Sequence, residues 1–260
     1  MKLYRIRGAI LHYYYILKSS PDRITDVFYW PSIDIVVWGL TSLYFTRNSN
    51  ASTLLPFLLS GIILWTIVYQ GQREISFGLL EVLWNRNMVN MFTTPLTFTE
   101  WIVSITVTAL AKSSLSFIVA AVLALVLYKM NVFNEGFYLL PFLALLTLFA
   151  YAVGFFVSGL ILRYTTKIQT LAWSTMALIS PFSAIYYSVS TLPIWAQKIA
   201  LLIPPSYIFE GMRQVILKKS LDTNLLLAAL LLDLAYLILS LIYLKMSFDK
   251  VLDKGLAKLY

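Results

Sequence analysis

The 260-residue chain contains no cysteine and a single histidine, His12. The lack of cysteine excludes disulfides and thiolate metal sites. With one histidine no H-E-x-x-H zinc motif can form, and the sequence also lacks the G-x-S-x-G serine motif and the G-x-x-x-x-G-K-[ST] phosphate-binding loop. We therefore expect no cofactor, no metal and no enzyme chemistry on this chain.

Charged residues are also scarce. They make up 12% of the chain, whereas 60% is hydrophobic; soluble domains average about 25% charged and about 45–50% apolar. One membrane span requires roughly 20 apolar residues, and the sequence supplies roughly six such runs. We predict an all-α, polytopic membrane protein with six transmembrane helices, folded as one domain over residues 1–260.

The pattern along the chain predicts three parts. Residues 1–27 have the spacing of a basic amphipathic helix lying in the membrane interface, broken at Ser20-Pro21-Asp22. A six-span bundle follows over 28–246, and a basic tail over 247–260. The expected spans are 28–45, 54–80, 101–128, 137–162, 168–181 and 224–243. The fifth is short for a crossing, and no cleaved signal peptide is predicted at the N-terminus.

Basic residues predict the orientation. The net charge is +8, and most basic residues outside the spans fall on the side that carries the N-terminus. Because cytoplasmic loops are enriched in Lys and Arg, both termini are expected in the cytoplasm of a plasma (inner) membrane protein. Lys218 and Lys219 count against this orientation. Membrane topology explains the charge more simply than nucleic-acid binding, which we do not predict.

A polar stretch over residues 81–100 separates two long apolar runs. Its apolar residues recur at helical spacing, and Pro95 ends the pattern. We predict a short helix lying along the membrane surface, which docks a soluble partner. The residues expected to carry this contact are Glu81, Trp84, Asn85, Arg86, Asn87, Asn90 and Phe92.

A second unusual stretch covers residues 180–213. It is too apolar for a loop and too interrupted by proline for one span. We predict a re-entrant pair of short helices, whose irregular backbone must be buried in protein or line a wet cavity. Together with Asp34 in the first span, the residues assigned to this region or to a translocation path are Pro181, Tyr186, Tyr187, Trp195, Glu210 and Arg213.

Three ionisable residues fall within expected spans: Asp34, Lys112 and Asp233. Such groups are costly in lipid and indicate function or a buried pair. We expect Asp34 to pair with Lys112, and Asp233 to face other helices; a structural role is favoured over a proton relay. Aromatic residues, 15% of the chain, are assigned chiefly to interfacial belts. The alternative is an aromatic path for a sugar or amphiphile at Tyr186 and Tyr187.

These motifs occur in the order found in one known family. They are Trp30-Pro31, Asp34 and Trp38-Gly39; E-x-x-W-x-R-N at 81–87 with Pro95-Leu96 and Glu100; and Pro181, Tyr186-Tyr187, Leu192-Pro193, Trp195 and Glu210-Gly211-Met212-Arg213. Over nearly its full length the chain resembles the permease subunit of ABC exporters of the second type. Ser188 departs from the pattern, because relatives often carry proline after the paired aromatics.

The resemblance implies partners and a mechanism. It implies that residues 81–100 hold a coupling helix, that 181–213 hold external re-entrant helices, and that two permease chains, expected to be identical, assemble in lipid with two ATPase subunits. ATP and Mg would bind the ATPases, and the substrate would be a glycan, lipid, drug or other amphiphile. Three alternatives stay open: a carrier or channel using Asp34, Lys112 and Asp233; an intramembrane enzyme; and an immunity or assembly factor.

Overall fold

The computed structural model describes residues 1–48 and 54–254, and all secondary structure within these ranges is helical. The expected tail lies partly outside them, since the last helix continues to Lys254 and residues 255–260 are not described. The α-helices are α1 (Leu3–Ser19), α2 (Pro21–Asn48), α3 (Leu54–Trp84), α4 (Met88–Thr93), α5 (Phe98–Tyr128), α6 (Leu139–Tyr164), α7 (Leu171–Ile179), α8 (Ile194–Ala200), α9 (Pro204–Lys218) and α10 (Thr223–Lys254).

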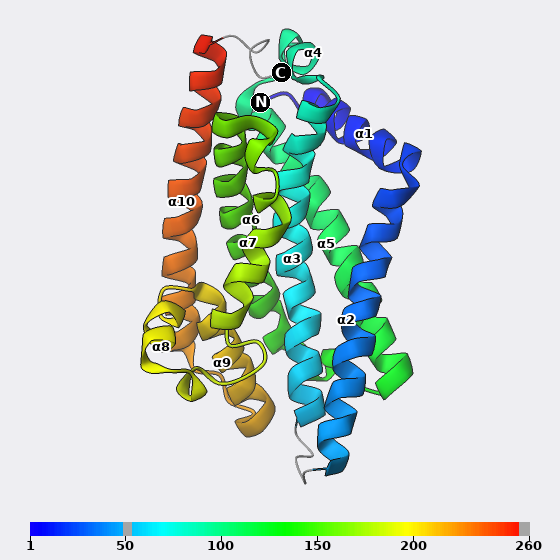
Figure 1. Cartoon of the computed structure of the whole chain (residues 1–260), viewed down its shortest axis with the longest axis vertical. Helices are drawn as coiled ribbons and strands as arrows, with labels where there is room; N and C mark the ends of the chain where they lie inside the picture. The colour runs from blue at the N-terminus through cyan, green and yellow to red at the C-terminus, as the bar shows by residue number, and fades with distance from the viewer. Residues whose placement is uncertain (49–53, 255–260) are drawn as a thin grey trace.

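The long helices run side by side along the long axis of the molecule (Figure 1). Among the described residues, three segments are long and apolar enough to cross a membrane: Phe98–Tyr128, Gly136–Ile168 and Thr223–Asp253. The N-terminus, α4 and the end of α10 lie at one end of the bundle, and α8 and α9 lie toward the other (Figure 1). We call these the α4 end and the α8–α9 end. The protein is thus a bundle of apolar helices with short helices near both ends.

The first long helix begins at Pro21, seven residues before the expected start of the first span, and contains a proline. Pro31 cannot donate a backbone hydrogen bond to the carbonyl of Val27, one turn earlier. The buried hydroxyl of Ser116 on α5 donates to that carbonyl at 3.0 Å instead. A neighbouring helix therefore satisfies the group that the proline leaves without a partner, which is how membrane helices tolerate proline.

The centre of the bundle is the contact of α3 with α6, where small residues let the backbones approach. A Cβ on Gly154 would lie 2.9 Å from the Cβ of Ile75 and 3.2 Å from the carbonyl of Gln72. The hydroxyl of Ser76 is 3.5 Å from the Gly154 carbonyl. Close packing and hydrogen bonds, rather than exclusion of water, hold helices together in lipid. α3 therefore has a fixed position against α6.

The segment expected as the fifth span is short in the structure, as its sequence indicates. The α-helix α7 has nine residues, about 14 Å long, against an apolar bilayer core of about 30 Å. A 3-10 turn at Ser180–Phe182 extends it, so the apolar helical segment is Leu171–Phe182. Pro181 is the reason that regular helix ends here. The number of six crossings therefore stays a prediction.

Candidate functional site

The turn from α3 into α4 is a tight corner built around Arg86. Arg86 has φ of 50°, its N–H donates to the carbonyl of Leu83 at 3.0 Å, and the N–H of Asn87 donates to Val82 at 2.9 Å. This pair of bonds is the Schellman motif, which closes a helix through one left-handed residue, usually glycine. An arginine here costs about 1–2 kcal/mol relative to the right-handed region. The corner is therefore fixed, and its left-handed position carries a charged side chain.

Apolar packing attaches α4 to the bundle. Met88 is fully buried and Met91 is 9% exposed. The ring of Phe92 lies 5.7 Å from Trp101 at the start of α5 and 4.8 Å from Phe248 near the end of α10. Phe248 also stacks on Trp101 at 6.0 Å. Although α4 has only six residues, it is anchored to two long helices besides α3.

The start of α5 is closed by a capping box and by α1. The side chain of Thr97 accepts from the Glu100 N–H, and the Glu100 carboxylate accepts from the Thr97 N–H at 3.0 Å. The same carboxylate accepts from the backbone N–H of Lys2 at 2.7 Å and pairs with Arg5 at 3.7 Å. Two orphan donors of α5 are thereby satisfied, and the N-terminus is tied to the base of α4.

A buried tyrosine adds a second contact between α1 and α5. Trp101 Nε1 donates to the hydroxyl oxygen of Tyr13 at 3.0 Å, and burial raises the pKa of the Tyr13 phenol above its usual value. Ile6 and Tyr13 are the residues of α1 that are buried, whereas Leu3 and Tyr14 of the expected apolar face are exposed. α1 therefore presents an apolar face away from the bundle, as an interfacial helix does.

The predicted docking residues separate into an exposed group at the corner and a buried group. Asn85, Arg86 and Asn90 are exposed, and Asn87 is half-buried; the Asn90 amide donates to the Asn87 side chain at 3.2 Å. Trp84 closes α3, where its Nε1 donates to Gln169 at 3.0 Å. The polar groups of this corner thus form a surface beside the anchored face of α4.

Glu81 belongs to the buried group. The expectation that it lies on a surface helix is wrong. Because α3 continues to Trp84, Glu81 is inside a long helix and 7% exposed. Its carboxylate pairs with Arg23 of α2 at 2.9 Å. The residue thus links α2 to α3 beneath the corner and does not form part of the docking surface.

The expected Asp34–Lys112 pair is also wrong. Lys112 of α5 instead pairs with Glu74 of α3 at 2.5 Å, and both side chains are about one-tenth exposed (10% and 11%). The preceding residue on α3, Arg73, pairs with Asp26 of α2 at 2.9 Å. With the Arg23–Glu81 pair, three ion pairs connect α2, α3 and α5 inside the α4 half of the bundle.

At the α8–α9 end, a carboxylate holds the irregular segment 183–191. Glu210 of α9 accepts from the Ser188 hydroxyl at 2.9 Å and from the Val189 N–H at 2.7 Å, and it pairs with Arg213 at 2.6 Å. Arg213 in turn donates to the carbonyl of Ala184 at 3.0 Å. We call this set the Glu210 clamp. Glu210 and Arg213 therefore position the loop that carries Tyr186 and Tyr187.

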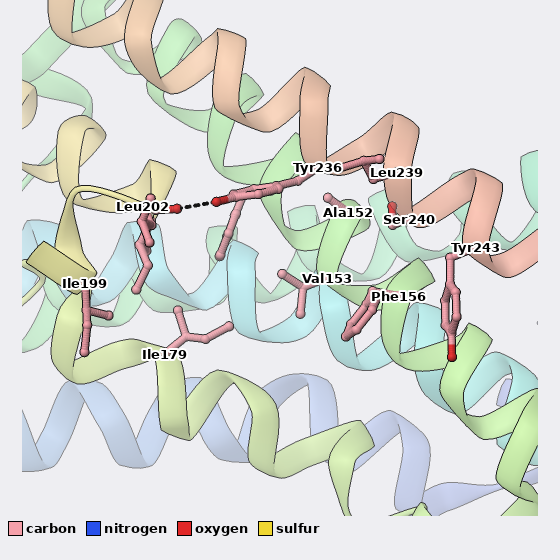
Figure 2. Close-up of a pocket in the computed structure, with 12 residues that line it drawn as sticks. Ala152, Val153, Phe156, Ile179, Ile199, Leu202, Tyr236, Leu239, Ser240 and Tyr243 are labelled. Carbon is pink, nitrogen blue, oxygen red and sulfur yellow. Dashed lines mark hydrogen bonds between the residues drawn. The ribbon is translucent and has the colours of Figure 1, made fainter.

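Two of the cavities in the molecule bear on the predicted site residues. The larger of these two, ≈ 570 Å³, is almost wholly apolar and is bounded by α6, α7, α8, the turn after α8, and α10 (Figure 2). At its rim Tyr236 donates to the Leu202 carbonyl at 2.8 Å, as Figure 2 shows. Trp195 is exposed on α8 and does not line it. The second cavity, ≈ 210 Å³, lies between α2, α3 and α7 and contains Asp34 and Tyr186.

Asp233, the third ionisable residue singled out in the spans, lies within α10. Its side chain is fully buried, and neither carboxylate oxygen has a hydrogen-bond partner among the described residues. Its carboxylate therefore adds no hydrogen bond to the packing of α10 within the part of the chain that the structure describes. Asp34, Lys112 and Asp233 thus occupy three separate environments and are not joined in a relay.

A comparison with known protein families identifies the class of protein. A family model described as "ABC-2 family transporter protein" matches residues 33–245, most of the chain. The chain belongs to this ABC-2 transporter family. A comparison with curated proteins found no match. The ABC-2 chain is therefore a multi-pass membrane component of an ABC transporter, as its apolar helices also indicate.

Several residues that shape this ABC-2 site were not found by sequence reasoning. Glu74 and Arg73 lie inside the long helix α3, where averaging over an apolar window hides single charges. Gln169 and Phe248 lie 85 and 156 residues beyond Trp84 and Phe92, so no local pattern connects them. The sequence did contain one signal for them. Arg73 and Glu74 are adjacent charges in a membrane helix, and such charges require partners.

Proposed function

We propose that the chain is the permease subunit of an ATP-driven ABC exporter that moves an amphiphilic, glycan, lipid or drug-like substrate. Two copies would assemble in the plasma membrane with two separate ATPase subunits, which bind ATP and Mg. The observation that carries the proposal is the α3–α4 corner, which is rigidly anchored by Met88, Met91 and Phe92 yet exposes Asn85, Arg86 and Asn90. Family membership supports it.

The geometry suits transmission of force from a soluble partner. In such an exporter, ATP binding draws the two ATPases together, and the permease helices reorient between inward and outward states. A partner can shift that equilibrium only through different affinities for the two states, so its docking element must move the spans with it. The Schellman corner fixes α4 to α3, and Phe248 and Trp101 fix it to α10 and α5.

Docking is tested with a variant that preserves the backbone. Arg86→Gly suits the left-handed position, so it removes the side chain without straining the corner; it is combined with Asn90→Ala. Tagged protein is purified in mild detergent from its native membrane, and ATPase activity is measured. We expect an ATPase subunit to co-purify with the wild type and to be lost at least tenfold from the double variant.

The control is Arg7→Ala, which removes an exposed positive charge from α1 near the same end. It should retain the ATPase. A wild-type protein that purifies folded but alone would contradict the proposal as a whole. An ATPase that stays bound to the double variant would contradict only the docking assignment.

A carrier that works without an ATPase is the competing function. It requires ionisable groups that act together, yet Lys112 is occupied by Glu74, and Asp233 is enclosed without a partner among the described residues. Proteoliposomes decide between the two functions. Transport driven by an ion gradient alone, and abolished by Asp34→Asn, would establish the carrier; dependence on ATP and the ATPase subunit would exclude it.

A further inference from the structure

The cavity around Asp34 has walls of aromatic side chains. Its volume is ≈ 210 Å³, and among its lining residues are Trp30, Asp34, Trp38, Trp65, Tyr69 and Tyr186. They come from α2, from α3 and from the loop that the Glu210 clamp holds. One carboxylate thus faces a space bounded by the rings of three tryptophans and two tyrosines.

The carboxylate in this cavity has no partner within the protein. Asp34 is exposed, and it makes no hydrogen bond or ion pair with residues 1–48 or 54–254; no Lys or Arg lines the cavity. Three other acids on α2 and α3 are each paired with a basic group: Asp26 with Arg73, Glu74 with Lys112 and Glu81 with Arg23. The bundle therefore leaves one accessible negative charge available in an aromatic environment.

The aromatic walls are held in place. Trp38 and Tyr186 are stacked, with ring centroids 4.6 Å apart and planes inclined by 22°. Trp30 Nε1 donates to Asp26 at 3.2 Å. A cation placed over such rings is attracted electrostatically by their faces. Because the rings are already ordered, little entropy is lost when a ligand enters.

The chemistry favours a cation over a neutral sugar. A sugar needs several acceptors as well as donors, but the acceptor side chains of the cavity besides Asp34 are the hydroxyls of Tyr69, Ser180 and Tyr186, and Ser180 already donates to Ala177 at 3.2 Å. The ring of Tyr69 already has a cation near it, the guanidinium of Arg73 at 5.8 Å. Pockets for whole drug-sized ligands measure about 300–1,000 Å³, so this cavity fits a headgroup.

We propose that the Asp34 cavity binds the substituted ammonium group of an organic cation, with the carboxylate neutralising its charge and the aromatic rings covering its methyl or methylene groups. Resting on the proposed function, this assigns organic cations as the substrate class of the exporter. The same headgroup chemistry occurs in free amphiphilic cations and in choline or ethanolamine lipids, and the test below separates these sources.

Binding is measured on the purified chain in maltoside detergent by equilibrium dialysis of benzyltrimethylammonium. The neutral isostere neopentylbenzene serves as the comparison. We expect the cation to bind at least tenfold more tightly than the isostere. Asp34→Asn and Trp38→Leu should each weaken it at least fivefold, and Asp34→Glu should restore most of the affinity. Equal binding of the neutral isostere, or an unchanged affinity in Asp34→Asn, would overturn the proposal.

The control variant is Asp222→Asn, which removes the same charge outside the cavity and keeps the oxygen that accepts from Asn224. It should bind like the wild type. Nanodiscs of pure phosphatidylglycerol are then compared with nanodiscs containing phosphatidylcholine: competition by the choline lipid, lost in Asp34→Asn, identifies a lipid headgroup as the source, and its absence identifies a free cation. Binding of an uncharged oligosaccharide that displaces the ammonium would assign the cavity to sugars and overturn the proposal.

Failure of the cavity assignment can be distinguished from failure of the proposed function. Co-purification of the ATPase is scored on the same preparations, and Asp34→Asn should leave it unchanged, because Asp34 lies on α2 away from the α3–α4 corner. A wild-type protein that retains the ATPase but does not bind the cation refutes the cavity assignment alone. Cation binding without any ATPase refutes the exporter but leaves the cavity assignment standing.

Discussion

The two ends of the bundle hold their short helices in different ways. At the α4 end, several aromatic rings meet around Phe248, and a capping box and a Schellman corner close the helix termini. At the α8–α9 end, Glu210 accepts two hydrogen bonds from the loop, and its ion-pair partner Arg213 donates a third to the loop carbonyl of Ala184. The first end distributes its stability over many apolar contacts, whereas the second relies on one pair of charged groups.

The ends also treat proline differently. Near the α4 end the carbonyl freed by Pro31 is satisfied from another helix, by Ser116. Toward the α8–α9 end the carbonyl of Ala177, one turn before Pro181, accepts from the adjacent Ser180 at 3.2 Å. The first arrangement joins two helices, and the second is local. We therefore expect substitutions at the α4 end to affect global stability, and those at the α8–α9 end to open one segment.

The largest effect is expected from Phe248→Ala. The ring is 3% exposed, and truncating a buried phenylalanine costs about 3–5 kcal/mol. The free energy of unfolding is measured by denaturant titration in detergent. Met246→Ala, at an exposed position of the same helix, should change it by less than about 0.5 kcal/mol. Equal effects of the two substitutions would show that the aromatic cluster is not what holds this end.

The second-largest effect on stability is expected from breaking the Glu210 clamp. Glu210→Ala leaves Arg213 without its carboxylate, at an expected cost of about 2 kcal/mol, below the 3–5 kcal/mol of fully buried pairs because the side chains are partly exposed. Hydrogen–deuterium exchange should accelerate in residues 183–191 and stay unchanged in α3 and α5. Lys198→Ala, on exposed α8, is the control. Faster exchange throughout the bundle would contradict the local role of the clamp.

Much of the architecture could be predicted from hydropathy and proline positions. The apolar runs located α5, α6 and α10 to within a few residues, apart from the end of α10, and Pro95 marks the exit from α4. The boundary that was wrong, at Glu81, followed from reading a charged residue as a surface residue. It is instead buried because Arg23 neutralises it. Pairing between helices depends on their rotation and depth, which the sequence of one helix does not specify.

In the candidate site, too, local features could be predicted from the sequence, whereas contacts between helices could not. Asn85, Arg86 and Asn90 were expected on a short surface helix; Asn90 lies on α4, whereas Asn85 and Arg86 form the turn before it. The partner of Lys112 was assigned to Asp34, although Glu74 lies closer in space. The cavity at Asp34 requires α2, α3, α7 and the loop of Tyr186 to converge. No local pattern encodes such a meeting of four segments.

A double-variant cycle sharpens the difference in how proline is accommodated. Ser116→Ala leaves the buried carbonyl of Val27 without a donor and should cost about 1–2 kcal/mol. In a Pro31→Ala background the new N–H can donate to that carbonyl, so the cost of Ser116→Ala should fall close to zero. The free energies of unfolding of the four proteins are compared. Additive effects would show that the hydroxyl does not replace the missing backbone donor.

The smallest expected effect is a pH dependence at the α4 end. Burial lowers the pKa of His12 on α1 below its usual value of 6.5. The unfolded chain therefore binds the proton first, and stability is full above pH 6.5 and declines as the pH falls through the lowered pKa of the folded state. Unfolding is followed between pH 7.5 and 5, and His12→Gln should flatten this slope. If His12→Gln leaves the slope of stability against pH unchanged, the pH dependence comes from other titratable groups.

The corner at Arg86 makes α3 a lever arm. A helix of 31 residues is about 46 Å long, so a tilt of about 5° imposed at one end displaces the other by about 4 Å. α3 also carries Trp65 and Tyr69, two walls of the Asp34 cavity. A small rotation applied to α4 would therefore widen or narrow that cavity against α2 without any bond within α3 having to break.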